Sequence, residues 1–177
     1  VHEHPEIEMG RGVGASMICS DVLISHTGYL TEAIRRDRFK RNIPLMFKDR
    51  EKYPDRLLGK FLMLRDWVHM ARYSWEENNK QMNNKTIEYA QNAIKAFEET
   101  FLNDNNMYQD EAIQFYSEAM SMLNLGHAYS TSTIFEDVSG KKHNIEVAGR
   151  FKTEDDFNTI VANKLKAIKK EHDNEFA

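Results

Sequence analysis

The sequence predicts a mainly α-helical protein, an antiparallel bundle of about five helices with one β-hairpin, at about residues 131–148, before the C-terminal helix. Apolar residues recur at spacings of three and four along most of the chain, as on one face of a helix. Short polar connections separate these stripes, which favours antiparallel neighbours in a bundle. One segment instead alternates polar and apolar residues around a turn at residues 139–142, as a hairpin does.

The first two helices are expected on either side of two prolines. The first runs from about Ala15 to Arg38, and Pro44 is expected to interrupt the helical pattern after it. Pro54 suits the first position of the second helix, which extends to about Lys80. The apolar stripe of this second helix is the clearest in the chain: Leu57, Phe61, Leu64, Val68, Ala71 and Trp75.

Three further helices are predicted from the same periodicity. The third carries Ile87, Ala90, Ile94, Phe97 and Phe101. The fourth carries Ile113, Tyr116, Met120 and Leu123, and Gly126 is expected to end it. The last begins at the N-cap Thr153, with acidic residues in its first turn. Its apolar face comprises Phe157, Ile160, Val161, Leu165 and Ile168.

Length and composition favour one folded domain. A chain of 177 residues with 41% apolar and 29% charged residues has enough apolar content for a core, so a folded chain is expected rather than overall disorder. Residues 1–14 are expected to form an extended arm and residues 15–177 a single helical domain with the hairpin as an insertion. No apolar run is long enough to cross a membrane, and the polar start is unlike a secretory signal. A cytoplasmic or virion location is therefore expected.

The cysteine content is consistent with this expected location. The single cysteine, Cys19, excludes an internal disulfide framework and fits a reducing compartment. It lies beside an apolar helical stretch, so a buried, inert thiol is predicted.

Charge is unevenly distributed along a chain whose net charge is −4. Residues 98–118 are acidic. A compact basic cluster, suited to phosphate or to an acidic partner surface, comprises Arg35, Arg36, Arg38, Lys40 and Arg41. We interpret it as a contact site for nucleic acid or an acidic partner, although cations are also favoured at the end of a helix.

Metal ligands are sparse. No cofactor and no metal site are predicted. Weaker alternatives are a metal held by His2 and His4 in the N-terminal arm, or by Asp66 and His69, which share one helix face. A two-metal bundle site would need a second carboxylate–histidine motif on another helix, and the sequence has none there.

Arg65 and His69 lie one turn apart on a predicted bundle helix. This pair resembles the arginine–histidine motif of HEPN ribonucleases, small helical bundles that usually dimerise. The resemblance implies that the two side chains position and activate an RNA 2′-hydroxyl. It covers only this stretch, and fewer residues separate Arg65 from His69 than in the family motif.

The function expected from these observations is that of a non-catalytic structural or interaction subunit of a larger assembly, as a homo-oligomer or with other protein subunits. The reasons are an isolated hairpin, an N-terminal arm, segregated charge and helices that are apolar on more than one side. Leu62 and Phe115, for example, lie off the main stripes. Abundant asparagine and scarce cysteine suit a viral or phage particle, among other sources. The alternative is a helical nucleic-acid-binding protein or HEPN-like ribonuclease using Arg65 and His69.

Overall fold

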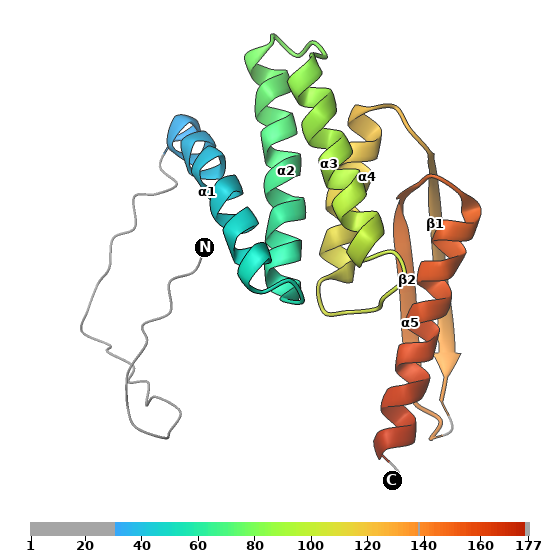
Figure 1. Cartoon of the computed structure of the whole chain (residues 1–177). Coiled ribbons are helices and arrows are strands. Elements are labelled where there is room, and N and C mark those ends of the chain that lie inside the picture. The colour runs from blue at the N-terminus through green and yellow to red at the C-terminus, as the bar shows by residue number, and fades with distance from the viewer. Residues whose placement is uncertain (1–30, 138, 176–177) are drawn as a thin grey trace, which may run out of the picture.

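The computed structural model describes residues 31–137 and 139–175, with side chains up to residue 170. Within these ranges the fold is mainly helical, with five helices and one antiparallel hairpin before the last helix, as predicted (Figure 1). The elements are α1 Glu32–Lys52, α2 Leu57–Glu77, α3 Asn84–Thr100, α4 Gln109–Met122, β1 His127–Glu136, β2 Lys142–Phe151 and α5 Glu154–Glu175. The predicted arm (residues 1–14), the predicted helix start at Ala15 and Cys19 lie outside the described residues.

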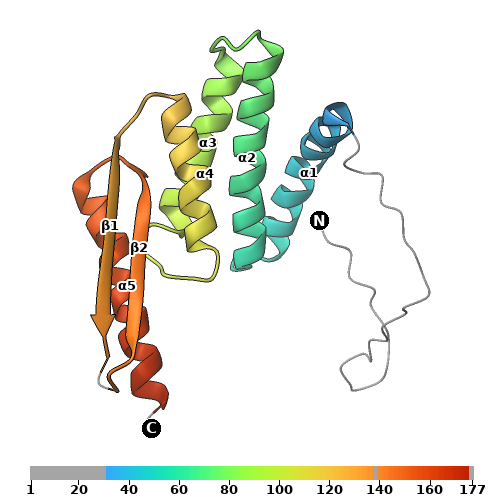
Figure 2. The ribbon, with the colours of Figure 1, turned by 180° about the vertical axis from the view of Figure 1, so that it is seen from behind.

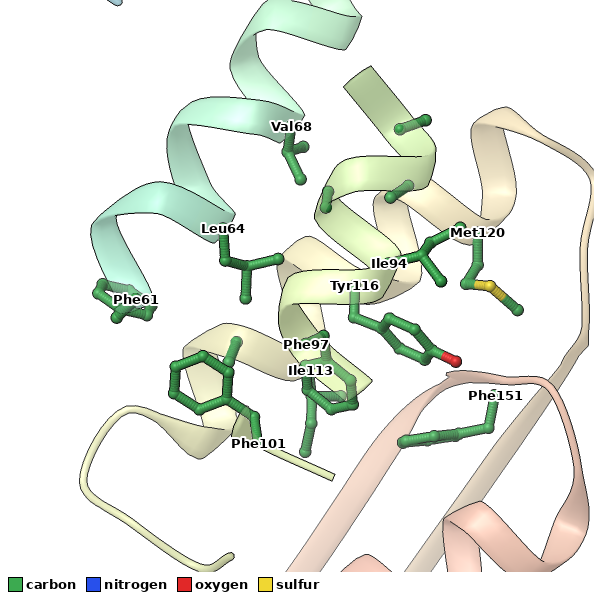
Figure 3. Close-up of a cluster of buried hydrophobic side chains, with 14 of the residues drawn as sticks. Phe61, Leu64, Val68, Ile94, Phe97, Phe101, Ile113, Tyr116, Met120 and Phe151 are labelled. Atoms are coloured by element: carbon green, nitrogen blue, oxygen red, sulfur yellow. The ribbon is translucent and has the colours of Figure 1, made fainter. Parts of the chain in front are cut away.

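Helix α2 lies between α1 on one side and α3 and α4 on the other (Figures 1 and 2). Leu64, Val68 and Ala71 are completely buried there. Figure 3 shows Leu64 and Val68 directed toward α3 and α4. Leu62, which lies off the main stripe, is buried as well. The wide apolar surface of α2 is therefore explained by burial on two sides within the chain.

Helix α1 continues through Pro44, so the predicted interruption was wrong. Proline removes one backbone donor and costs about 3 kcal/mol inside a helix. Pro44 is exposed, whereas Phe39, Asn42 and Met46 are buried on the opposite side of the helix. Residues before and after the proline therefore pack on the rest of the protein, and this packing offsets the local cost.

The boundaries of α2 and α4 also differ from the prediction. Pro54 lies in the turn before α2, which begins at Leu57 after the N-cap Arg56. Helix α4 ends at Met122, and Asn124 rather than Gly126 takes the first left-handed position after it, with φ 52°. The amide of Leu125 donates to the carbonyl of Met120 at 2.8 Å, which satisfies the helix end.

The N-termini of α3 and α5 follow their capping residues. The side chain of Asn83 accepts the amide of Thr86 at 3.0 Å and begins α3. Thr153 was the predicted N-cap of the last helix, and its hydroxyl accepts the amide of Asp156 at 3.1 Å. The Asp156 carboxylate accepts the Thr153 amide in return, at 3.2 Å. Such reciprocal bonds satisfy two amides that the helix itself leaves open.

The hairpin packs on its own chain. Strands β1 and β2 pair antiparallel, from His127 opposite Phe151 to Glu136 opposite Lys142. Strand β2 lies beside α4, and α5 covers one face of the hairpin (Figures 1 and 2). The buried side chains of β2 on that covered face are Ile145, Val147 and Phe151. The hairpin thus obtains the support that two isolated strands lack.

Four of the six carboxylates in the acidic segment at residues 98–118 are paired within the chain. Glu99 pairs with Arg50 of α1 at 3.4 Å, and Glu118 pairs with Arg72 of α2 at 2.6 Å. Two further pairs join this segment to later parts of the chain, Lys152 with Glu98 and Lys164 with Asp110, whereas Lys95 and Glu99 pair within α3. Charge segregated along the sequence therefore becomes pairing between elements in the fold.

Replacement of Gly149 by alanine is expected to destabilise the contact between β2 and α4. A Cβ at this position would lie 2.7 Å from Ile113 Cγ2 and 2.8 Å from Ser117 Oγ. Overpacking of this kind costs roughly 1–3 kcal/mol. Urea unfolding of Gly149→Ala measures the loss. The exposed neighbour Ala148 supplies the control, since Ala148→Ser should change the unfolding free energy by less than about 0.5 kcal/mol. Equal stability of Gly149→Ala and wild type would contradict this close packing.

Candidate functional site

The predicted basic cluster divides between two places. Arg36 and Lys40 face the end of α2, where both pair with Glu77, at 2.7 and 3.8 Å. Arg35 and Arg38 instead line a pocket between α1 and α2, and Arg41 is exposed. The five cations therefore do not form one patch.

The α1–α2 pocket has a volume of about 620 Å³. It brings Arg35 and Arg38 of the basic cluster together with Arg65 and His69, the second predicted pair. Arg72 and Tyr73 also line this pocket and were not predicted from the sequence, although their spacing from His69 and Arg65 places them near the same helix face. The lining residues are Glu32, Arg35, Arg38, Phe39, Arg65, His69, Arg72, Tyr73 and Glu76.

Arg65 and Arg72 in the α1–α2 pocket are each held by two hydrogen bonds to a carboxylate oxygen. Nε and Nη2 of Arg65 donate to Oδ1 of Asp66 at 2.9 and 2.7 Å. Nε and Nη2 of Arg72 donate to Oε1 of Glu118 at 2.9 and 2.6 Å. A forked pair of this kind fixes the plane of the guanidinium as well as its position.

His69 is half-buried and uncharged at neutral pH. Its ring stacks on Phe39 with centroids 4.4 Å apart. Nδ1 is buried and has no hydrogen-bond partner in the described structure. Burial, followed by the positive charges of Arg72 and Arg65, lowers the pKa of His69 to about 4. The pKa of the neighbouring Tyr73 is raised to about 12, first by burial and then by Glu32.

Asp66 is completely buried next to Arg65. Burial raises the pKa of Asp66, against the lowering effect of Arg65. Two guanidinium groups therefore surround the Asp66 and His69 pair that the sequence suggested for a metal, an arrangement that repels a cation. Among the described residues, no group of three or more His, Cys, Asp or Glu side chains is placed to hold a metal ion. The other suggested ligands, His2 and His4, lie outside the described residues.

Arg65 and His69 line the same pocket, as the resemblance to HEPN ribonucleases requires. Arg65 also contacts the face of Phe39, with its guanidinium carbon 5.7 Å from the ring centroid. The assignment of ribonuclease chemistry to these two residues stays a prediction.

A second candidate site is the outer edge of β1. The amide of Asp137 donates to the carbonyl of Lys141 at 3.0 Å, and hydrogen-bonded pairs alternate along the hairpin from there. Every second residue of β1 therefore belongs to a pair that is not hydrogen-bonded to β2. The backbone groups of these residues point away from β2, and they include those of Ala128, Ser130, Ser132 and Ile134. Ile134 is also 68% exposed.

The outer edge of β2 differs from that of β1. Its outward amide at Arg150 donates to the Ser117 hydroxyl of α4 at 2.8 Å. Helix α4 therefore closes the β2 edge at Arg150, and among residues 31–137 and 139–175 the β1 edge is the more open of the two.

Comparison with known proteins identifies no relative. No protein-family model matches the sequence, and no curated protein or solved structure matches it significantly. None of the helices in the described ranges combines the length and apolar character needed to cross a bilayer. Function must therefore be argued from the pocket and the strand edge themselves.

The low pKa of His69 predicts acid sensitivity. Between pH 6.5 and about 4 the unfolded chain binds a proton at this residue that the folded protein does not. The unfolding free energy should therefore fall as pH decreases through this window. The groups around the ring are Glu32, Arg35 and Arg38 from α1, and Arg65, Arg72 and Glu76 from α2.

Urea unfolding of wild type and His69→Gln at several pH values isolates this effect, because other groups titrate in both proteins. The variant should lose less stability between pH 6.5 and 4. NMR of the imidazole gives the pKa directly, with His69→Gln identifying the signal. A titration midpoint at or above 6.5 would show that the ring is not shielded as described.

Proposed function

We propose that this protein is a non-catalytic subunit of a larger assembly, and that subunits join through the edge of β1. The observation that carries the proposal is the length of this open edge. Strand β1 has ten residues, longer than the usual five or six. Open backbone donors and acceptors on such a strand are a template for a strand from another chain.

The residues of β1 support this interpretation. Natural proteins protect exposed edges with lysine, proline, bulges or short strands. From Ala128 to Phe135 the strand carries no charge and no proline. Serine and threonine alternate through the middle of β1. These small side chains leave room for another strand to form backbone hydrogen bonds along the edge. The edge therefore lacks the usual features that prevent pairing.

The expected occupant is a second copy of the same chain. The two charged or titratable ends of β1 are His127 and Glu136, and both are exposed. Antiparallel pairing of two β1 strands brings each His127 end toward the Glu136 end of the other copy, whereas parallel pairing brings like ends together. The result is a four-stranded sheet with two-fold symmetry. A virus or phage particle component is one specific form of such an assembly.

Substitution of Ser132 by proline tests the edge. The outward amide of Ser132 makes no bond within the hairpin, so proline removes an intermolecular donor while the pairing with β2 remains. Sedimentation equilibrium of wild type should show concentration-dependent association. Ser132→Pro should shift the protein to monomer, and Ser132→Ala should associate like wild type.

A second pair of variants distinguishes a loss of association from misfolding of the hairpin. Ser130 and Ala148 are direct cross-strand neighbours, so lysine at either position occupies the same face of the hairpin. Ser130→Lys, on the open edge, should weaken association far more than Ala148→Lys. Amide exchange adds a local test, because the Ser130 and Ser132 amides should be protected only in the associated state. A monomer at every accessible concentration, with these amides exchanging freely, would refute the proposal.

A further inference from the structure

The α1–α2 pocket combines features that the assembly role does not use. Four arginines converge there from two helices, against the two carboxylates of Glu32 and Glu76. Helix α1 itself carries eight basic and four acidic side chains in a chain whose net charge is −4. Positive charge is thus concentrated on α1, which supplies Arg35 and Arg38 to this pocket, while Asp66 and Glu118 pair with the two arginines of α2.

The charges on α2 are also held in place before any ligand arrives. Asp66 and Glu118 bind Nε and Nη2 of Arg65 and Arg72. In the described structure these bonds leave the Nη1 amino group of each guanidinium for another acceptor. Because the guanidinium planes are fixed, a ligand that binds them immobilises fewer side-chain rotamers. Planar donor groups in fixed positions match the oxygens of a phosphate.

On α1, Arg35 is held less firmly. It pairs with Glu32 at 3.7 Å, and both side chains are about half exposed. An exposed pair at this separation contributes little free energy, so a dianion can displace Glu32 from Arg35. The pocket therefore has two fixed guanidinium groups on α2 and, on α1, at least one that is free to adjust to a ligand.

The state of His69 agrees with a positive field at this position. Burial is the main cause of the lowered pKa of His69, and the positive charges of Arg72 and Arg65 lower it further. Its Nδ1 is buried beneath this surface and has no hydrogen-bond partner in the described structure.

We propose that the α1–α2 pocket binds a phosphate group, through Arg35 and Arg38 of α1 and Arg65 and Arg72 of α2. The phosphate belongs either to a small phosphorylated molecule or to the backbone of a nucleic acid. The two sources share the chemistry of recognition. They differ in how strongly affinity depends on salt, because a polymer that occupies several cations releases more counterions.

Isothermal titration of the full chain tests binding with two probes, inorganic phosphate and a short single-stranded RNA, each at low and high salt. Tighter binding of RNA with a steep salt dependence identifies a nucleic-acid backbone. Binding of phosphate with RNA no tighter identifies a small ligand. Absence of binding for both probes at low salt would overturn the proposal.

Variants locate the site. Arg35→Gln/Arg38→Gln removes the two cations on α1, and Arg72→Gln removes one fixed cation on α2. Each should weaken binding at least about tenfold, since a charge-assisted hydrogen bond is lost. Two controls remove one positive charge elsewhere on α1: Arg41→Gln from the same basic cluster, and Arg50→Gln, which has a carboxylate partner as Arg72 does. Loss of affinity in the controls equal to that in the pocket variants would overturn the assignment.

His69 gives a readout inside the pocket. A bound phosphate adds negative charge beside the ring and should raise the pKa of the imidazole, as followed by NMR with and without phosphate. An unchanged titration at saturating phosphate would place the anion elsewhere. Because the β1 variants leave the pocket intact, Ser132→Pro should bind phosphate like wild type, which separates this proposal from the assembly proposal.

Discussion

The burial of α2 on both sides is the constraint on which the rest of this structure depends. Leu64, Val68 and Ala71 are completely buried toward α3 and α4, while Met70 and Tyr73 pack with Phe39 of α1. A helix enclosed in this way can place charged side chains only along the narrow strips between its neighbours. Arg65, His69 and Arg72 lie along one such strip, next to α1. The same central position that stabilises the bundle therefore creates the pocket.

The attachment of α1 explains why the pocket remains open. Helix α1 contacts α2 through a small number of buried side chains, and its other fixed contacts include ion pairs at the ends: Arg36 with Glu77 and Arg50 with Glu99. Exposed pairs of this kind contribute only about 0–1 kcal/mol each. A helix held by a narrow apolar contact is less firmly anchored than α3 or α4, and it has space beside it for polar groups. Several of its own apolar residues, such as Phe47, remain exposed.

Local signals in the sequence were sufficient for much of the fold. The stripes of α3 and α5, with their caps at Asn83 and Thr153, depend on neighbouring residues and were predictable. Continuation of α1 through Pro44 depends on packing against α2, which no local signal contains. The splitting of the basic cluster follows from helical periodicity, because Arg35 and Arg38 are three residues apart and Arg36 and Lys40 are four apart. Arg72 was predictable from the same rule, but its partner Glu118, forty-six residues away, was not.

The hairpin shows how tertiary contacts redirect a conclusion drawn from sequence. Two isolated strands need outside support, and α4 and α5 supply it within the chain, so the hairpin itself is no longer evidence for a partner. That support is unequal, because the Ser117 hydroxyl of α4 pairs with the outward amide of Arg150 on β2. Among the described residues, no helix bonds the outward backbone groups of β1, and its central residues carry no charge to discourage another strand. The proposed assembly therefore uses one strand edge rather than the whole hairpin, and this edge is separate from the α1–α2 pocket proposed to bind an anion.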